Sequence, residues 1–154
     1  MFKTVWGLGL QQGGDALKVR RAVFVCEQGY DENAEFDHND GYAAHVFVSD
    51  ENDAPIASGR MYPDGDRILM DRIAVMPAFR ALPYDELVLR VMLYKAQQSQ
   101  MREIAAAVYE GGEALYLPFG FKKAGDTTLR GLPAALLTVP RESVIWDSAC
   151  KHAE

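Results

Sequence analysis

The stretch of residues 67–98 constrains the fold most, because it changes from a strand pattern to a helix pattern across a short connection. Its first part, RILMDRIAV, is a nearly continuous apolar run that stops before Pro77, as is typical of a strand covered on both faces. From Pro83 onward the apolar residues follow a helical period, and proline suits the first turn of a helix. The helical face is formed by Leu87, Val88, Val91, Met92 and Ala96. Because the first amides of a helix are unpaired and carry the positive end of its dipole, this arrangement predicts an anion site.

Length and charge exclude several classes of function. The 154 residues, 49% of them hydrophobic, suffice for one core, so we expect a single domain over 1–154 with a C-terminal extension at 140–154. A net charge of -6 argues against nucleic acid or an anionic membrane as partner, since both require a basic surface. Cys26 and Cys150 are too few for a disulfide framework or a zinc site. Because the chain shows neither a signal-peptide pattern nor a long apolar run, we expect it to be cytoplasmic.

The remaining patterns predict an α/β fold with a mixed sheet. Residues 2–8 favour a first, edge strand, and Asp15 is placed to cap a helix that exposes Arg20 to water. Residues 30–42 form an acidic loop without periodicity, which is either a solvated surface or an attraction for a cationic amine. Further strands are expected at 45–48, 56–62, 104–108 and 135–139, with a short helix at 112–117.

Three motifs in this order resemble the GNAT family of acetyl-CoA-dependent N-acyltransferases. The segment IAVMP, residues 73–77, resembles the strand before the family's Arg/Gln-x-x-Gly-x-Gly/Ala loop, and Arg80 matches the first position of that loop. The segment LYLPFGF, residues 115–121, is similar to the family's F-Y-x-x-x-G-F motif. The run VFVCEQG at 23–29 resembles the opening of the bacterial ElaA-like branch, as do the polar residues that follow it, Glu35, Asp37, Asp40 and His45. The resemblance implies a GNAT-like fold with a mixed, mostly antiparallel sheet flanked by helices.

The resemblance also implies transfer of an acyl group from acetyl-CoA to an amine of a small molecule or protein. In the family, strand backbone and loop amides hold the cosubstrate, and the matching positions here are Ile73, Ala74, Val75, Arg80, Ala81, Leu82 and Tyr84. We expect the strands at 68–75 and 104–108 to run parallel and to separate, leaving a cleft lined by Val75, Val108 and Tyr116. Tyr116 matches the tyrosine that protonates the departing thiolate. Packing of its ring onto the sheet is the alternative reading.

The candidates for the base that accepts the amine proton are polar residues bordering the apolar elements. They are His45, Asp71, Glu35 and Asp37. His45 is the first choice because its imidazole titrates near neutrality, although a lone histidine is more often structural. No recognised metal-ligand spacing occurs among Asp37, Asp40 and His45, so no metal is expected.

The loop departs from the family pattern at two positions, because Pro83 and Asp85 stand where the glycines belong. Proline has no amide to donate, and one hydrogen bond to a charged group is worth about 1.5–3 kcal/mol, or roughly 10- to 150-fold in affinity. Two other functions therefore stay open. One is a GNAT-derived binding or regulatory module with impaired CoA binding. The other, suggested by the spacing of Glu35, Asp37 and Asp40 and by GRMYP at 59–63, is an acyltransferase similar to acyl-homoserine-lactone synthases. A homodimer is compatible with either.

Overall fold

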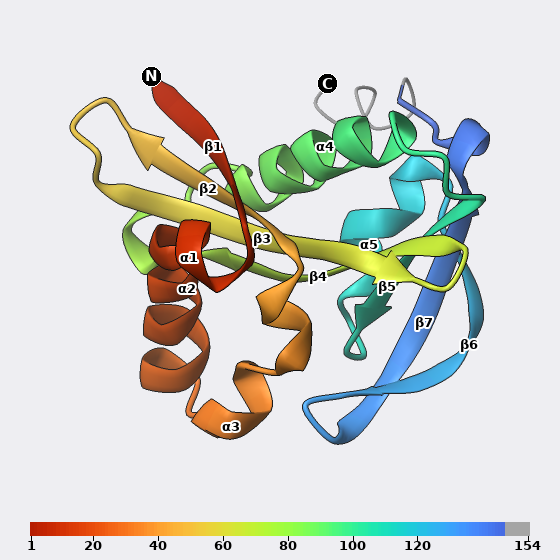
Figure 1. The fold of residues 1–154 in the computed structure, drawn as a ribbon, viewed down its shortest axis with the longest axis horizontal. Helices are drawn as coiled ribbons and strands as arrows, with labels where there is room; N and C mark the ends of the chain where they lie inside the picture. Colours follow the sequence, from red (N-terminus) through yellow and green to blue (C-terminus); the bar gives the residue numbers. More distant parts are fainter. Residues whose placement is uncertain (147–154) are drawn as a thin grey trace. The chain divides into compact units, whose positions relative to one another are not determined.

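A seven-stranded mixed sheet forms the framework of the protein. The structure is a computed structural model and describes residues 1–146. The strands follow the order β1-β2-β3-β4-β5-β7-β6 (Figure 1). β4 and β5 are paired in parallel, whereas β1–β2, β2–β3, β5–β7 and β6–β7 are antiparallel. The strands are β1 (Phe2–Leu8), β2 (Ala44–Asp50), β3 (Pro55–Asp64), β4 (Arg67–Val75), β5 (Glu103–Val108), β6 (Lys122–Leu129) and β7 (Leu132–Pro140).

Short helices and one long helix accompany the sheet. The α-helices are α1 (Gly9–Gln12), α2 (Gly14–Arg20), α3 (Glu32–Glu35), α4 (Tyr84–Gln97) and α5 (Glu113–Tyr116). Single 3₁₀ turns lie at His38–Gly41, Pro77–Phe79, Leu117–Phe119 and Arg141–Ser143. No helix in the described part of the chain is long and apolar enough to cross a membrane. The predicted α/β class with a mixed sheet is confirmed.

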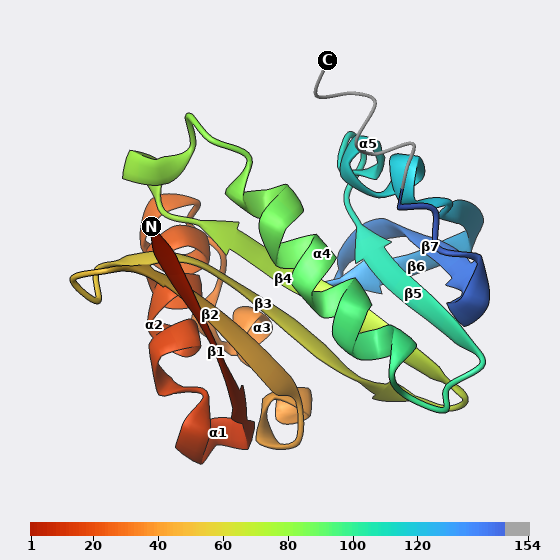
Figure 2. The same ribbon diagram turned by 90° about the horizontal axis from the view of Figure 1, so that it is seen from above.

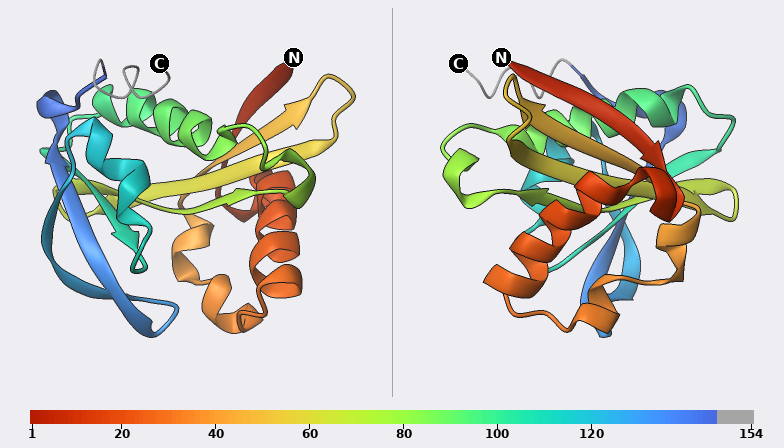
Figure 3. Two further views of the ribbon diagram at one scale, coloured as in Figure 1. Left: turned by 180° about the vertical axis from the view of Figure 1, so that it is seen from behind. Right: turned by 60° about the vertical axis from the view of Figure 1, so that its left-hand side comes forward.

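The chain forms two compact units, one made of Met1–Tyr62 and Asp71–Met92 and the other of Pro63–Met70 and Leu93–Glu154, of which residues up to 146 are described. In the first unit, α1, α2 and α3 cover one face of the strands and α4 begins on the other (Figure 3). The close approach of α4 requires Gly59 on β3, since a Cβ there would lie 2.7 Å from Cγ1 of Val88. The core under α2 consists of Val19, Val23, Phe24 and Ala74.

The helix that Asp15 was predicted to cap is α2, and it differs from that prediction in two ways. Its N-cap is Gly13 rather than Asp15, which lies in the first turn. After α2 the chain widens into a π-helix, Arg21–Glu27, in which the amide of Gln28 donates to the carbonyl of Val23 at 3.0 Å. A π-helix is rare and is found frequently at functional sites. This one carries Glu27 at its end.

The second unit contains one strand that the pattern did not predict. β6 is largely polar, with the sequence KKAGDTTL, and pairs with β7 alone at the edge of the sheet. An edge strand without an apolar face lacks the alternation by which strands are recognised. Two hydrogen bonds tie residues 145 and 146 to the second unit: the Ile145 amide donates to the Phe119 carbonyl at 2.9 Å, and Trp146 Nε1 donates to Gln97 Oε1 at 3.1 Å. The rest of the predicted C-terminal extension lies outside the described residues.

Candidate active site

The parallel pairing of β4 with β5 is short. It joins Arg67–Met70 to Glu103–Ala106 and ends there, although β4 continues to Val75. The predicted parallel direction is therefore confirmed. Beyond the last pair, β4 leads through the 3₁₀ turn at Pro77–Phe79 into α4, as Figure 2 shows. The segment predicted to hold the cosubstrate thus begins where the ladder stops.

Arg72 marks an irregularity inside β4. Its φ of 57° is left-handed, a conformation that costs a residue with a side chain roughly 1–2 kcal/mol. Successive residues of a regular strand point to opposite faces, yet Arg72 and its neighbour Asp71 reach the same buried group of charges and pair at 3.0 Å. Such a residue persists only where its surroundings hold it. At Arg72, the surroundings that hold this conformation are charged side chains.

Seven charged side chains form this group, which we call the ionic cluster: Arg20, Glu35, Asp37, Asp40, Arg60, Asp71 and Arg72. It holds three arginines against four carboxylates, a formal excess of one negative charge. All members are buried except Asp37, whose side chain is 29% exposed. Buried charges are tolerated when they are paired and hydrogen-bonded, and every member here has at least two partners.

Arg60 lies at the centre of the cluster. From β3 it donates through Nε and Nη2 to the two oxygens of Asp71 at 2.8 and 2.7 Å. Its Nη1 donates to Asp37 at 2.7 Å and to Asp40 at 3.0 Å. The ring of Tyr62 covers the guanidinium at 4.9 Å. Burial, aided by the charge of Asp71, raises the pKa of Tyr62 to about 12, which excludes this phenol as a base near neutrality.

Arg20 was expected to face water, but this prediction is wrong, because the residue is fully buried. From the last turn of α2 it donates to Glu35 Oε2 at 2.8 Å, to Asp40 Oδ1 at 2.6 Å and to the Glu35 carbonyl at 2.9 Å. Charge-assisted hydrogen bonds of this kind are the strong ones, and they replace the water that the guanidinium loses. Arg72 also binds the end of α3, donating to the carbonyls of Ala34 and Glu35 at 3.2 and 3.1 Å.

The cluster favours the ionised form of Asp37 and Asp40. Burial opposes the charged form of Asp37, but hydrogen bonds and charges from Arg60 and Arg72 outweigh it and hold the pKa of that carboxyl below its ordinary value. Burial likewise opposes ionisation of Asp40, and Arg20 and Arg60 again lower its pKa. Three carboxylates of the acidic loop, those of Glu35, Asp37 and Asp40, are therefore paired with arginines of the ionic cluster, whereas Asp31 and Glu32 are exposed.

The loop before α4 presents the predicted anion-binding residues. Arg80 donates through Nε to the carbonyl of Val75 at 3.0 Å, which fixes its guanidinium against the end of β4. In the described chain, the amides of Ala81 and Leu82 donate no hydrogen bond. The Glu86 amide in the first turn is taken by Asp85 Oδ1 at 2.8 Å. The loop therefore contains one cation, Arg80, and two amides without a hydrogen-bond acceptor among the described residues, those of Ala81 and Leu82. Its role in binding an anion stays a prediction.

Comparisons with known proteins agree on the fold. No protein-family model matches the sequence. A candidate acetyltransferase of Bacillus subtilis is 26% identical over 136 residues, covering 84% of this chain and 90% of that protein. A candidate N-acetyltransferase from Lactobacillus plantarum superposes with a TM-score of 0.79 at 21% identity, over 90% of this chain and 97% of the other. ElaA of Escherichia coli gives a TM-score of 0.74 at 20% identity, over 90% and 99%.

The chain has the GNAT fold. Its structural neighbours are GNAT-family acetyltransferases, ElaA among them. The fold predicted from three motifs is thereby confirmed, including the resemblance to the ElaA-like branch. Identities near 20% show the fold alone, so the roles of individual residues must be argued from their surroundings.

Of the four candidate bases on this GNAT fold, His45 has the most distinctive environment. It is buried on β2, its Nε2–H can donate to the Asp40 carbonyl at 3.2 Å, and Nδ1 has no partner among the described residues. Burial lowers its pKa, so the ring is neutral at neutral pH and carries a lone pair without a donor. Glu35, Asp37 and Asp71 belong to the ionic cluster. The role of each as a base stays a prediction.

Tyr116 lies in the second unit at the end of α5. Its side chain is 5% exposed, and its ring packs edge-on against Phe121 with centroids 5.4 Å apart. This packing is the structural role considered above and is compatible with a hydroxyl that also acts as a proton donor. The catalytic role of Tyr116 stays a prediction.

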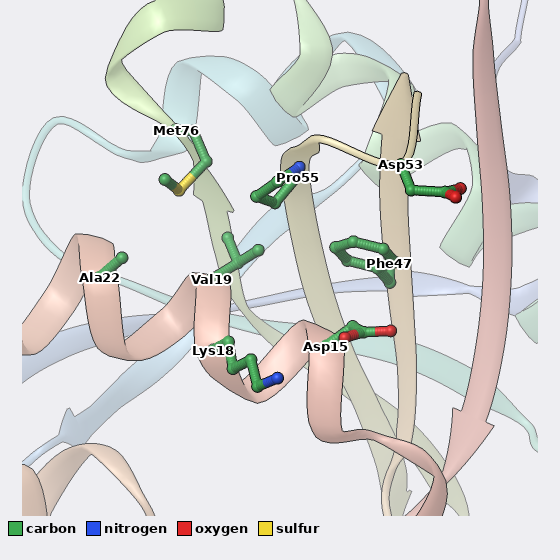
Figure 4. A pocket seen from close by; sticks show the side chains of 8 residues that line it. All are labelled: Asp15, Lys18, Val19, Ala22, Phe47, Asp53, Pro55 and Met76. Atoms are coloured by element: carbon green, nitrogen blue, oxygen red, sulfur yellow. The ribbon is translucent and has the colours of Figure 1, made fainter. Parts of the chain in front are cut away.

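A pocket of about 270 Å³, which the sequence analysis did not predict, lies between α2 and the end of the β2–β3 hairpin (Figure 4). Its apolar lining comes from Val19, Ala22, Phe47, Pro55 and Met76, and Asp15, Lys18 and Asp53 stand around it. Asp53 is already paired with Lys3. Over residues 1–146, no group of three or more His, Cys, Asp or Glu side chains is arranged to hold a metal.

Proposed function

We propose that the protein is an N-acetyltransferase that uses acetyl-CoA to acylate an amine of a small molecule or protein. The observation that carries this proposal is the short parallel ladder of β4 and β5 on a GNAT fold. The pairing of β4 with β5 ends at Met70, and we infer that backbone groups of residues 73–75 beyond it are available to a ligand, except the Val75 carbonyl, which accepts from Arg80. This strand end leads directly to Arg80, whose guanidinium is fixed by Val75. Neighbours of this fold include an acyl-CoA N-acyltransferase from Pseudomonas aeruginosa, which supports a CoA-type cosubstrate.

The proposed reaction needs three contributions from the chain. Backbone groups of Ile73 and Val75 bind the thioester carbonyl and the pantetheine arm, and Arg80 binds the pyrophosphate. The amine nitrogen attacks the thioester carbonyl carbon, the C–S bond breaks, and the amine loses one proton while the thiolate gains one. Tyr116 supplies the proton to sulfur. His45, which is neutral and buried and whose Nδ1 accepts no hydrogen bond among the described residues, is the candidate that we assign to accept the amine proton.

Glu35 and Asp71 fit a supporting role better than the role of base. Each accepts hydrogen bonds or ion pairs from two arginines inside the ionic cluster. A base must have a lone pair directed at the proton it takes, and these carboxylates direct theirs at guanidinium groups. We assign them to holding Arg72 and the strand that follows it.

The test is an acetyl-transfer assay that measures release of free CoA thiol from acetyl-CoA with a panel of primary amines, polyamines, amino acids and peptides. We expect amine-dependent release. Tyr116→Phe should reduce kcat about 10²- to 10⁴-fold while leaving KM for acetyl-CoA within a factor of about two, because general-acid catalysis contributes to the chemical step alone. Unchanged kcat in Tyr116→Phe would remove the acid role, and no release with any amine would count against the enzyme.

A second function is favoured by two features of the loop before α4. The loop lacks an amide at Pro83, and Asp85 takes the Glu86 amide that a phosphate would use. These two features support a binding or regulatory module that has kept the GNAT fold with weakened CoA binding. Thermal unfolding with acetyl-CoA, described in the Discussion, separates it from the enzyme.

A further inference from the structure

Arg80 is paired with Glu27, a residue of the VFVCEQG run to which the sequence analysis assigned no role. Glu27, at the end of the π-helix, accepts from Arg80 Nη1 at 2.7 Å through Oε2 and from Nη2 at 2.5 Å through Oε1. The two residues are 53 positions apart in sequence. Their side chains are 42% exposed for Arg80 and 35% for Glu27, so the pair lies at the surface, where a ligand can reach it.

The contact uses the part of Arg80 that recognises phosphate. A guanidinium binds carboxylate and phosphate by the same fork of two parallel N–H groups. Nε is turned inward to the Val75 carbonyl, so the outward fork is formed by Nη1 and Nη2, and Glu27 fills it. The Arg80 hydrogen bonds hold the pKa of Glu27 below its usual value, so this carboxylate is charged at neutral pH.

We propose that Glu27 is an internal competitor for the phosphate groups of acyl-CoA and thereby sets how tightly the protein binds them. This inference rests on the proposed function. Binding of the pyrophosphate to Arg80 requires Glu27 to give up the guanidinium fork and leaves two like charges close together. Glu27 acts through Arg80, so it is a positioning residue rather than a catalytic one. Ligands without phosphate, such as acetyl-pantetheine, do not enter this competition.

The alternative is that Glu27 holds Arg80 in the orientation that binds phosphate. The two roles predict opposite signs. Competition predicts that loss of the carboxylate tightens CoA binding, whereas orientation predicts that it weakens binding. Because Val75 already fixes Nε, Arg80 keeps one anchor without Glu27, and the structure favours competition.

The experiment compares the wild type with Glu27→Gln by calorimetric titration of CoA and of acetyl-pantetheine. Glu51→Gln is the matched control, since it removes the same charge from an exposed position in the β2–β3 turn. We expect Glu27→Gln to bind CoA roughly 2- to 10-fold more tightly, with no change for acetyl-pantetheine and no change in Glu51→Gln. Adding Arg80→Gln should cancel the gain, and about 1 M salt should shrink it. In the transfer assay, KM for acetyl-CoA should fall and kcat should stay within about two-fold.

The measurements distinguish failure of the inference from failure of the proposed function. If the wild type binds CoA and Glu27→Gln binds it equally or more weakly, the competition is overturned and the proposed function stands. If the gain appears equally with acetyl-pantetheine or survives Arg80→Gln, the inference is also overturned, because the effect does not act through the phosphate fork. If neither protein binds CoA or transfers an acetyl group, the inference and the proposed function fail together. If Glu27→Gln binds CoA and the wild type does not, the result supports both the role of Glu27 as a competitor and the CoA site.

Discussion

Replacing Asp71 with asparagine tests whether the ionic cluster is structural. The carboxylate is 3% exposed and accepts hydrogen bonds from Arg60 Nε and Nη2 and from Arg72 Nη1, at 2.8, 2.7 and 3.0 Å. Asparagine keeps the size, but it removes the charge and turns an amide N–H₂ toward guanidinium donors. Breaking a buried pair by removing one partner costs about 3–5 kcal/mol. For a chain of this length, that lowers Tm by roughly 6–20 °C.

The assay is urea and thermal unfolding of Asp71→Asn at about pH 7.5, with Asp126→Asn as control. Asp126 pairs with Lys123 at 3.1 Å, but its side chain is 87% exposed, so its loss should cost less than about 1 kcal/mol. A loss below about 1 kcal/mol for Asp71→Asn would refute the reasoning, because it would mean that Arg60 and Arg72 need no buried acceptor. Activity measured well below the lowered Tm should keep most of the wild-type kcat. A folded variant with kcat reduced more than about 100-fold would instead favour Asp71 as the base.

Two further predictions concern pH and the cosubstrate. The pKa of His45 is lower in the folded protein than the unperturbed value of about 6.5, so the unfolded chain binds the extra proton first; stability is full above about pH 6.5 and declines as pH falls below it. Tm should therefore fall between about pH 7.5 and 5.5, and His45→Gln should flatten that slope; equal slopes would contradict the assignment. Acetyl-CoA at about 100 times its Kd stabilises a folded protein by about 2.7 kcal/mol, or several degrees at this size. Because Pro83 lacks a donor and Asp85 repels phosphate, we expect a small shift for the wild type and a larger one for Pro83→Gly with Asp85→Gly, each against its own apo protein; no shift in either would favour the binding module.

Much of the fold could be predicted from residue patterns within short stretches of the sequence. The apolar run of β4 and the helical period of α4 were readable because burial of a strand or of a helix face repeats over neighbouring residues. The face itself was placed slightly wrong: Leu89 and Leu93 are fully buried, whereas Leu87 and Val91 are only partly so. The position of Arg80 after β4 was likewise predictable, since a motif of fixed spacing sets it.

The tertiary structure alone decided the environments of the charged residues. The sequence by itself determined a GNAT-like order of strands and helices, because this order depends on periodicity and turn residues within short windows. It could not show that Arg20 is buried, that Arg72 adopts a positive φ, or that Glu27 occupies Arg80. A charged side chain has no periodic signature of burial; it is buried only when partners from distant segments neutralise it, and those partners meet only when the chain has folded.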